Sequence, residues 1–79
     1  GSDVMTPMEG FYCFCENIRL LRQAHLLSKK EMADIMGINV KTLDMLEGNI
    51  LPKHLSTGAI FRLAEHFDIP PGRLFLPPS

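Results

Sequence analysis

The sequence predicts one small all-α domain. Apolar residues recur at three- and four-residue steps, helix start and stop signals divide the chain at short intervals, and no segment alternates as a strand would. The 79 residues are enough for one domain. We expect a disordered or tag-derived segment at residues 1–6, the domain at 7–76 and a tail at 77–79.

The first helix begins at a clear start signal. Thr6 is a suitable N-cap, Pro7 fits the first helical position, and Glu9 can complete a capping box. The apolar stripe that follows at helical spacing consists of Phe11, Phe14, Ile18 and Leu21. These signals predict a helix from about Pro7 to Ala24.

A short second helix is marked at both ends. Ser28 and Glu31 have the spacing of another capping box, and Gly37 follows the last apolar position. The expected helix covers residues 29–36.

A third helix follows after a tight link. Asn39 is a good N-cap, and Gly48 and Asn49 tolerate the left-handed conformation that ends many helices, so we expect a helix over 40–47. The link is too short for the second and third helices to lie antiparallel. Residues 28–47 are therefore predicted to form an angled helix-turn-helix.

The C-terminal part contains one longer helix and one short one. A loop around Pro52 precedes an apolar repeat that predicts a helix from about Ser56 to Phe67. Prolines at 70 and 71 fit only a helix start, so the segment Pro71 to Phe75 is predicted to form at most one or two turns.

Composition narrows the class of protein. The hydrophobic fraction is 46% and the charged fraction 22%, which are values of a globular chain. There is no apolar run of about 20 residues and no signal peptide, so we expect no membrane contact and a cytoplasmic location. The net charge is −1, but from Asn17 onward eight basic residues stand against six acidic ones, so the body of the domain is mildly basic.

Metal and enzyme chemistry are not indicated. Cys13 and Cys15 point to different sides of a helix, so we do not expect them to pair. A structural zinc site needs four ligands at recognisable spacings, and the three histidines form no second cluster. No nucleophile–base pair, phosphate loop or carboxylate cluster is discernible, so we expect neither an enzyme nor a cofactor.

The register of the central region resembles that of a known family. The matching positions are Leu27-Ser28, Glu31-Met32-Ala33, Met36-Gly37-Ile38, Thr42-Leu43, Leu46-Glu47, Pro52, Leu63-Ala64 and Ile69. Over residues 17–76 the chain resembles the phage repressor and Cro family of XRE-type helix-turn-helix domains. The resemblance implies a compact five-helix bundle, like the DNA-binding domain of lambda repressor, in a bacterial or phage transcription regulator that binds double-stranded DNA as a homodimer.

Each helix-turn-helix match has a physical reason. Ala33 is small because the helices cross closely there, Gly37 takes a conformation that disfavours a side chain, and Ile38 fills the core between them. The resemblance also implies a partly buried ion pair between Arg22 and Glu47; the alternative is that both side chains face solvent.

Helical spacing defines a candidate recognition face on the third helix. Leu43, Leu46 and Glu47 form its inner side, and the residues that project outward together are Val40, Lys41, Asp44 and Met45. With the flanking positions, the candidate DNA contacts are Lys29, Lys30, Asn39, Val40, Lys41, Thr42, Asp44, Met45, Lys53 and His54.

These residues offer complementary chemistry to DNA. Lys41 can bond guanine or a phosphate, and Asp44 can accept from a cytosine amine. Asn39 and Thr42 can bond a phosphate or a base edge. The second helix's start, with Lys29 and its free N–H groups, suits a phosphate.

The remaining candidates act at the edges of this face. Val40 and Met45 can touch thymine methyl groups. Lys53 and His54 can hold the DNA backbone on the far side.

The same face allows a second interpretation. The apolar residues Val40, Met45, Ile50 and Leu51 can form one patch, and such patches often mark protein interfaces. The alternative to DNA binding is therefore a module for protein interaction or dimerisation, in a regulator or an antitoxin, with little affinity for DNA.

The N-terminal aromatic residues are more numerous than the first helix needs. Phe11, Tyr12 and Phe14 are expected to cover the domain's own fourth or fifth helix, the alternative being a neighbouring subunit. His25 and His66 are expected to lie at helix ends.

Overall fold

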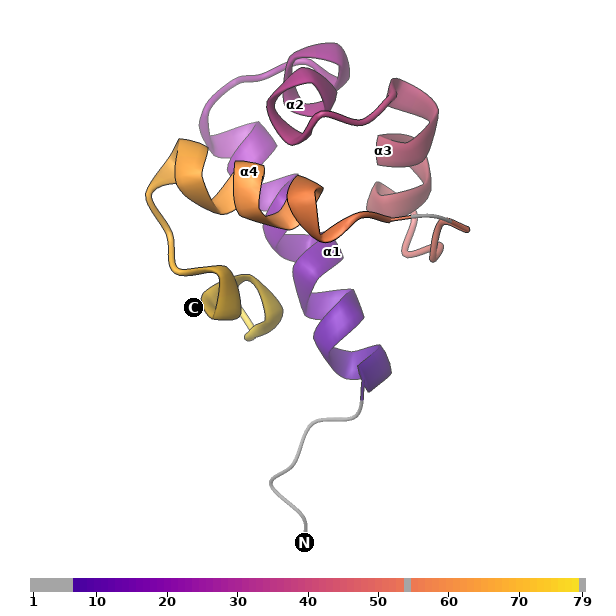
Figure 1. Cartoon of the computed structure of the whole chain (residues 1–79), viewed down its shortest axis with the longest axis vertical. Helices are drawn as coiled ribbons and strands as arrows, with labels where there is room; N and C mark the ends of the chain where they lie inside the picture. The colour runs from indigo at the N-terminus through magenta and orange to yellow at the C-terminus, as the bar shows by residue number, and fades with distance from the viewer. Residues whose placement is uncertain (1–6, 54, 79) are drawn as a thin grey trace, which may run out of the picture.

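The computed structural model describes residues 7–53 and 55–78, so the predicted N-cap Thr6 and the candidate contact His54 lie outside the described residues. Within them the chain forms only helices (Figure 1). They are α1 (Pro7–Ala24), α2 (Lys29–Met36), α3 (Val40–Glu47), α4 (Thr57–Phe67) and the 3₁₀ helix η1 (Pro71–Phe75). The all-helical fold is confirmed, and the expected fifth helix is a short 3₁₀ helix.

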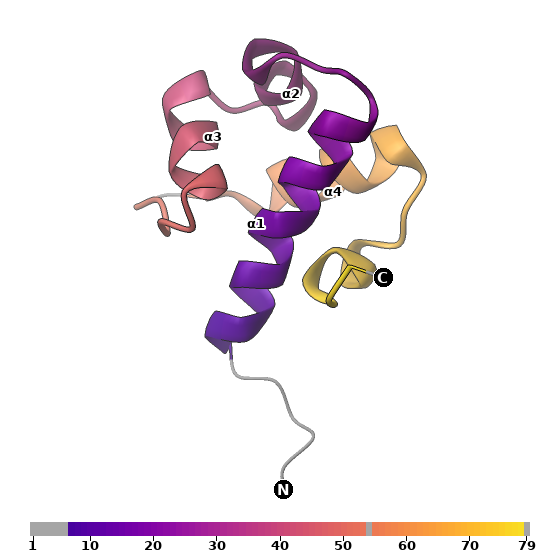
Figure 2. The same cartoon turned by 180° about the vertical axis from the view of Figure 1, so that it is seen from behind.

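The long helix α1 passes behind α4 in Figure 1 and in front of it in Figure 2. It contacts α3 and η1, while α2 contacts α3 and α4. The short helices α2 and α3 lie toward the C-terminal end of α1, and η1 lies beside its lower half. This arrangement leaves α3 at one side of the molecule.

The core is apolar and is drawn from all the helices. Its buried members are Phe11, Phe14, Cys15, Ile18, Met32, Ala33, Met36, Leu43, Leu46, Ala59, Leu63, Ala64 and Leu74. Ala33 is 1% exposed, as expected for a small residue at a close helix crossing. Ile38 is half-buried and packs against this core from the link between α2 and α3.

The starts of α2 and α3 follow the cap signals of the sequence, whereas Ser56 before α4 forms no side-chain cap bond. The Glu31 N–H donates to Ser28 Oγ and the Ser28 N–H donates to Glu31 Oε1, both at 3.1 Å, so the capping box of α2 is confirmed. Asn39 Oδ1 accepts from the Thr42 N–H at 2.7 Å. These bonds fix where α2 and α3 begin.

All four α-helices end in the same way. The residues with positive φ are Leu26 (54°), Gly37 (71°), Asn49 (61°) and Asp68 (54°). An aliphatic residue follows each one, and its N–H bonds the carbonyl five residues earlier, at 2.8–2.9 Å. This is the Schellman motif, which satisfies helix-end carbonyls. The apolar residues Leu27, Ile38 and Ile69 also pack against the core, whereas Ile50 after α3 is exposed. Gly48 has a φ of −91°, so Asn49 alone supplies the left-handed residue after α3.

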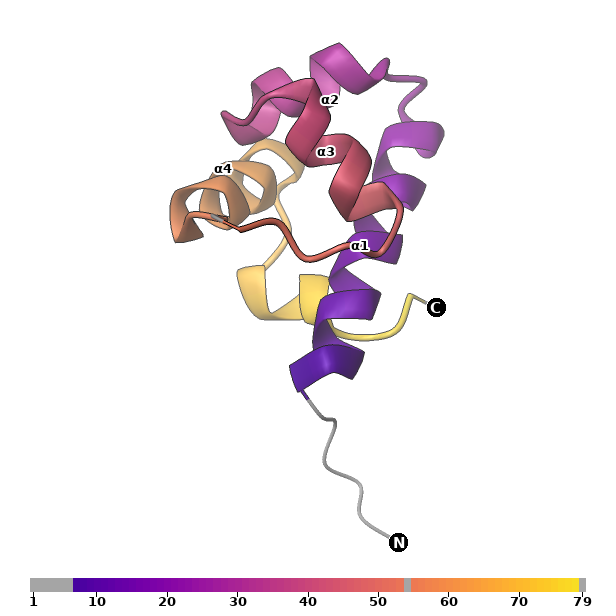
Figure 3. The same ribbon diagram turned by 90° about the vertical axis from the view of Figure 1, so that its right-hand side faces the viewer.

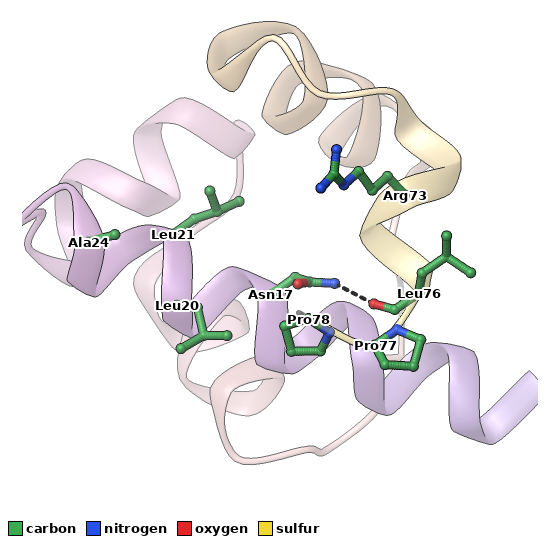
Figure 4. A pocket seen from close by; sticks show the side chains of 8 residues that line it. All are labelled: Asn17, Leu20, Leu21, Ala24, Arg73, Leu76, Pro77 and Pro78. Carbon is green, nitrogen blue, oxygen red and sulfur yellow. Dashed lines mark hydrogen bonds between the residues drawn. The ribbon is translucent and has the colours of Figure 1, made fainter.

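The 3₁₀ helix is tied to α1 by a polar and an aromatic contact. Asn17 Nδ2 donates to the carbonyl of Leu74 at 2.7 Å. It also donates to the carbonyl of Leu76 at 3.0 Å, as Figure 4 shows. The rings of Phe14 and Phe75 stack with centroids 4.9 Å apart. Phe14 therefore covers the chain's own fifth helix, whereas Tyr12 is 46% exposed.

The two described histidines lie at or near helix ends, as predicted. His25 follows the end of α1 and its ring lies 4.8 Å from that of Phe67, while His66 is in the last turn of α4. A hollow of about 270 Å³ lies between α1, η1 and the segment that follows η1, with Leu20, Arg73 and Pro77 in its lining (Figure 4).

Candidate nucleic-acid interface

The helix-turn-helix unit presents α3 at the surface. In Figure 3 the helix lies in front of the body, with α2 above it and α1 behind it. Gly37 makes the turn possible, because its φ of 71° is a conformation that side chains disfavour. A Cβ atom at this position would lie 2.7 Å from Arg62 Nη1.

An ion pair holds the C-terminal end of α3 against α1. Arg22 Nε and Nη2 donate to the two carboxylate oxygens of Glu47 at 2.7 and 2.9 Å, and the side chains are only 19% and 9% exposed. Arg22 Nη1 also donates to the Leu27 carbonyl at 3.2 Å. The hydrogen bond to Glu47 is the main reason that the pKa of Arg22 lies above its usual value. Arg22 therefore links α1, α3 and the chain before α2.

A second arginine, which was not predicted from the sequence to take part, also contacts the C-terminal end of α3. Arg19 Nη1 donates to the backbone carbonyl of Glu47 at 3.2 Å. The bond satisfies a carbonyl at the C-terminal end of α3, where a cation is favoured by the helix dipole. Its i, i+3 spacing from Arg22 is the sequence signal that both arginines share one face of α1.

The outer side of α3 is largely open. Leu43 and Leu46 are fully buried, whereas Lys41 and Asp44 are exposed. Val40 is 38% exposed, and Met45 is half-buried. Three of the four outward candidates are therefore exposed, and Met45 is the partly covered one.

Lys29 and Asp44 were candidates for separate DNA contacts, and the structure brings them together. Lys29 Nζ forms an ion pair with Asp44 Oδ1, which joins the first residue of α2 to the middle of α3. The side chains are 47% and 50% exposed. The spacing of 15 residues gives no local signal for this contact, so sequence analysis missed it.

The lysines of the chain lie in the helix-turn-helix unit and in the loop after α3. All four lie between residues 29 and 53, and the four arginines lie elsewhere. Lys30, Lys41 and Lys53 are exposed and form no ion pair among residues 7–53 and 55–78. Accessible point charges of this kind suit contact with phosphate groups.

The two polar candidates at the start of α3 have different surroundings. Asn39 is exposed, and its side-chain oxygen already caps α3, which leaves the amide nitrogen for a ligand. Thr42 is half-buried. Asn39 therefore combines a capping role with access to the surface.

The apolar candidates after α3 are accessible. Ile50 is 54% and Leu51 60% exposed. The Ile50 N–H donates to the Met45 carbonyl at 2.8 Å, so the loop folds back along α3. Val40, Met45, Ile50 and Leu51, which we term the apolar patch, thus belong to α3 and the loop that directly follows it.

The cysteines lie outside this interface. Cys15 is buried in the core and Cys13 is half-buried; both are free thiols. Burial raises the pKa of the Cys15 thiol to about 11, against a smaller opposing effect of Arg19. No group of three or more potential metal-ligating side chains occurs in the described part of the chain.

Fold and site together define a helix-turn-helix domain, a class that places its second helix in the DNA major groove. The chain belongs to the XRE-type helix-turn-helix family, because a family model described as Helix-turn-helix matches residues 18–74. This is a family of DNA-binding regulatory domains and not of enzymes. No curated protein and no solved structure gives a significant match. Among the described helices, none is both long and apolar enough to cross a membrane.

Proposed function

We propose that the chain is the sequence-specific DNA-binding domain of a transcription regulator that acts as a homodimer in the cytoplasm. One observation carries the proposal: α3 is anchored on its inner side by Arg22 and Glu47, while its outer side is open beside the start of α2. A recognition helix needs both properties, because the groove-facing residues must be held in register while remaining accessible.

The start of α3 supplies the base contacts. In helix-turn-helix complexes the N-terminal residues of the second helix reach the base edges. Lys41 is exposed there and can bond guanine, while Val40 can contact a thymine methyl group. Met45, in the second half of α3, can contact another methyl group. Asn39 and Thr42 extend the same edge and can bond a base edge or a phosphate.

The phosphate contacts come from α2 and from the loop after α3. The first N–H groups of a helix have no intrahelical acceptor, so the start of α2 attracts an anion. Lys29 and Lys30 flank that position, and Lys53 is exposed beyond the other end of α3. We assign His54 to the same DNA-backbone contact as Lys53.

Two copies are needed for useful affinity and specificity. One subunit offers few positive charges on the DNA-facing side, so it releases few counter-ions from the DNA and gains little affinity in this way. A two-fold dimer that binds half-sites about one helical turn apart doubles these contacts. The proposal therefore includes a palindromic DNA site.

The test is a titration of labelled duplex DNA at several salt concentrations, followed by fluorescence anisotropy. The logarithm of the binding constant should fall linearly with the logarithm of salt concentration, and Lys41→Ala should reduce the slope by about one unit. The matched control is Arg73→Ala, which removes an exposed cation from η1 and should leave the slope unchanged. Absence of salt-dependent binding by the unaltered protein at low ionic strength would contradict the proposal.

A second candidate function is protein contact through the apolar patch. It is favoured by the exposure of Ile50 and Leu51, because large aliphatic side chains that lie together on a surface often mark an interface. Light scattering of the Met45→Glu and Leu51→Glu variants tests it. A lower mass than that of the unaltered protein would support an interface here, and an unchanged mass would count against one.

A further inference from the structure

The ion pair between Lys29 and Asp44 occupies the position where DNA is proposed to bind. Lys29 is the first residue of α2, and Asp44 lies on the open side of α3. The pair spans the angle between the two helices. A cation at the start of α2 is also the group that a DNA phosphate would select.

The pair is easily exchanged for another partner. Its side chains are 47% and 50% exposed, and ion pairs in such surroundings contribute little to stability because water and salt screen them. By contrast, Arg22 and Glu47 make two hydrogen bonds and are 19% and 9% exposed. The first pair can therefore open without disturbing the fold that the second one holds.

We infer that Asp44 takes the place of a DNA phosphate in the free protein, and that Lys29 must leave Asp44 before it can contact DNA. The inference rests on the proposed DNA-binding function. Asp44 then lowers the affinity for DNA of any sequence. Its carboxylate keeps Lys29 from the phosphates and also adds a negative charge close to them.

The exchange also makes Asp44 a specificity-determining residue. Once Lys29 has moved to a phosphate, the carboxylate of Asp44 has lost its counter-ion and needs a hydrogen-bond donor. In the major groove the exocyclic amines of cytosine and adenine are the donors. A site that places such an amine opposite Asp44 is favoured over one that leaves the carboxylate unpaired.

Two matched variants separate this mechanism from a general change of charge. Asp44→Asn removes the carboxylate charge but keeps the shape of the side chain. Asp34→Asn removes the same charge from an exposed position on α2, and Asp34 forms no ion pair in the part of the chain that the structure describes. Only the first variant should release Lys29.

The first measurement needs no DNA. Brief acetylation with an amine-reactive ester, followed by mass spectrometry, gives the relative reactivity of the four lysines. In Asp44→Asn the reactivity of Lys29 relative to Lys30 should rise about twofold, because the Lys29 amine is no longer held against the Asp44 carboxylate and an exposed ion pair restrains its partners only weakly. It should not change in Asp34→Asn. An unchanged ratio in Asp44→Asn would overturn the inference.

The second measurement uses a mixed-sequence duplex at several salt concentrations. Asp44→Asn should bind roughly three- to tenfold more tightly at low salt, with a salt slope steeper by about one unit. On a mixed sequence no base amine is fixed opposite Asp44, so the unaltered protein keeps Lys29 on Asp44, whereas the variant frees it for a phosphate. Asp34→Asn should keep the original slope. If the unaltered protein binds but the two variants have equal slopes, the inference is wrong and the proposed function stands. If no variant binds, the proposed function fails and the inference fails with it.

The third measurement is selection from a pool of random duplexes. The unaltered protein should enrich cytosine or adenine at one position of each half-site, and Asp44→Asn should lose that preference while keeping the others. Retention of the same base preference by Asp44→Asn would overturn the specificity role.

Discussion

Arg22 and Glu47 join the first helix to the last residue of α3 through two hydrogen bonds, at 2.7 and 2.9 Å. A planar guanidinium that meets both oxygens of a carboxylate fixes direction as well as distance. The contact therefore sets the angle at which α3 leaves the body of the domain. The DNA-facing surface depends on that angle.

Arg22→Ala should lower the free energy of unfolding by about 2 kcal/mol, because it leaves the Glu47 carboxylate partly buried without its partner. Urea denaturation followed by circular dichroism measures the change. The control is Arg62→Ala, which removes an exposed arginine of α4 that makes no hydrogen bond among the described residues. If Arg22→Ala and Arg62→Ala lost equal free energy of unfolding, the ion pair of Arg22 with Glu47 would contribute nothing specific to stability.

Leu26→Gly should stabilise the protein by about 1 kcal/mol. Leu26 has a φ of 54° and is 91% exposed, so the leucine strains the backbone and contributes almost no packing. Asp68→Gly provides a comparison at the same position of another Schellman motif, with a smaller gain because aspartate tolerates this conformation better. The melting temperatures of the two variants, compared with that of the unaltered protein, measure these gains in stability. A decrease for Leu26→Gly would show that the left-handed strain is absent.

Gly37→Ala should destabilise the protein by about 1–2 kcal/mol, since an alanine there meets a left-handed backbone. The flexible end of Arg62 must also move away from the new Cβ atom. Gly72→Ala is the matched control, because a Cβ atom there meets nothing within 4 Å. Thermal unfolding should separate the two variants clearly; similar melting temperatures would contradict the strained turn.

The buried Cys15 thiol should make the protein less stable at high pH. Its pKa is about 11 in the folded protein, and about 8.5 in an unfolded chain. As pH rises between these values the unfolded chain releases this proton while the folded protein retains it, so unfolding becomes more favourable. Below both values the effect disappears.

Denaturation at a series of pH values under reducing conditions measures this effect. The Cys15→Ala variant should show a shallower decline of stability above about pH 9 than the unaltered protein. Cys13→Ser, at the half-buried cysteine, should retain the original decline. Identical curves for Cys15→Ala and the unaltered protein would show that the thiol is not responsible.

The helix positions could be predicted because their signals are local. Ser28, Glu31 and Asn39 mark helix starts through bonds that span three residues, and Gly37 marks a helix end through its own conformation. Leu26 shows the limit of such signals. It ends α1 in a left-handed conformation without being a glycine or asparagine, so its type gave no indication of this role.

The missed contacts join residues far apart in the chain. Asn17 holds carbonyls 57 and 59 residues away, and Lys29 meets Asp44 across the turn between two helices. Such pairs depend on how the helices pack. Residue types alone identified Lys29 and Asp44 as candidates, but only the packed structure shows that they neutralise each other.

Nuclear magnetic resonance of the ¹⁵N-labelled protein during titration with duplex DNA shows directly which helix meets the DNA. If α3 reads the DNA, the amide shift changes should concentrate at the start of α2 and the start of α3, including Lys29 and Lys41, while those of η1 stay small. Changes concentrated on η1 and the outer side of α4, with α3 unaffected, would contradict the claim that α3 is the DNA-reading helix.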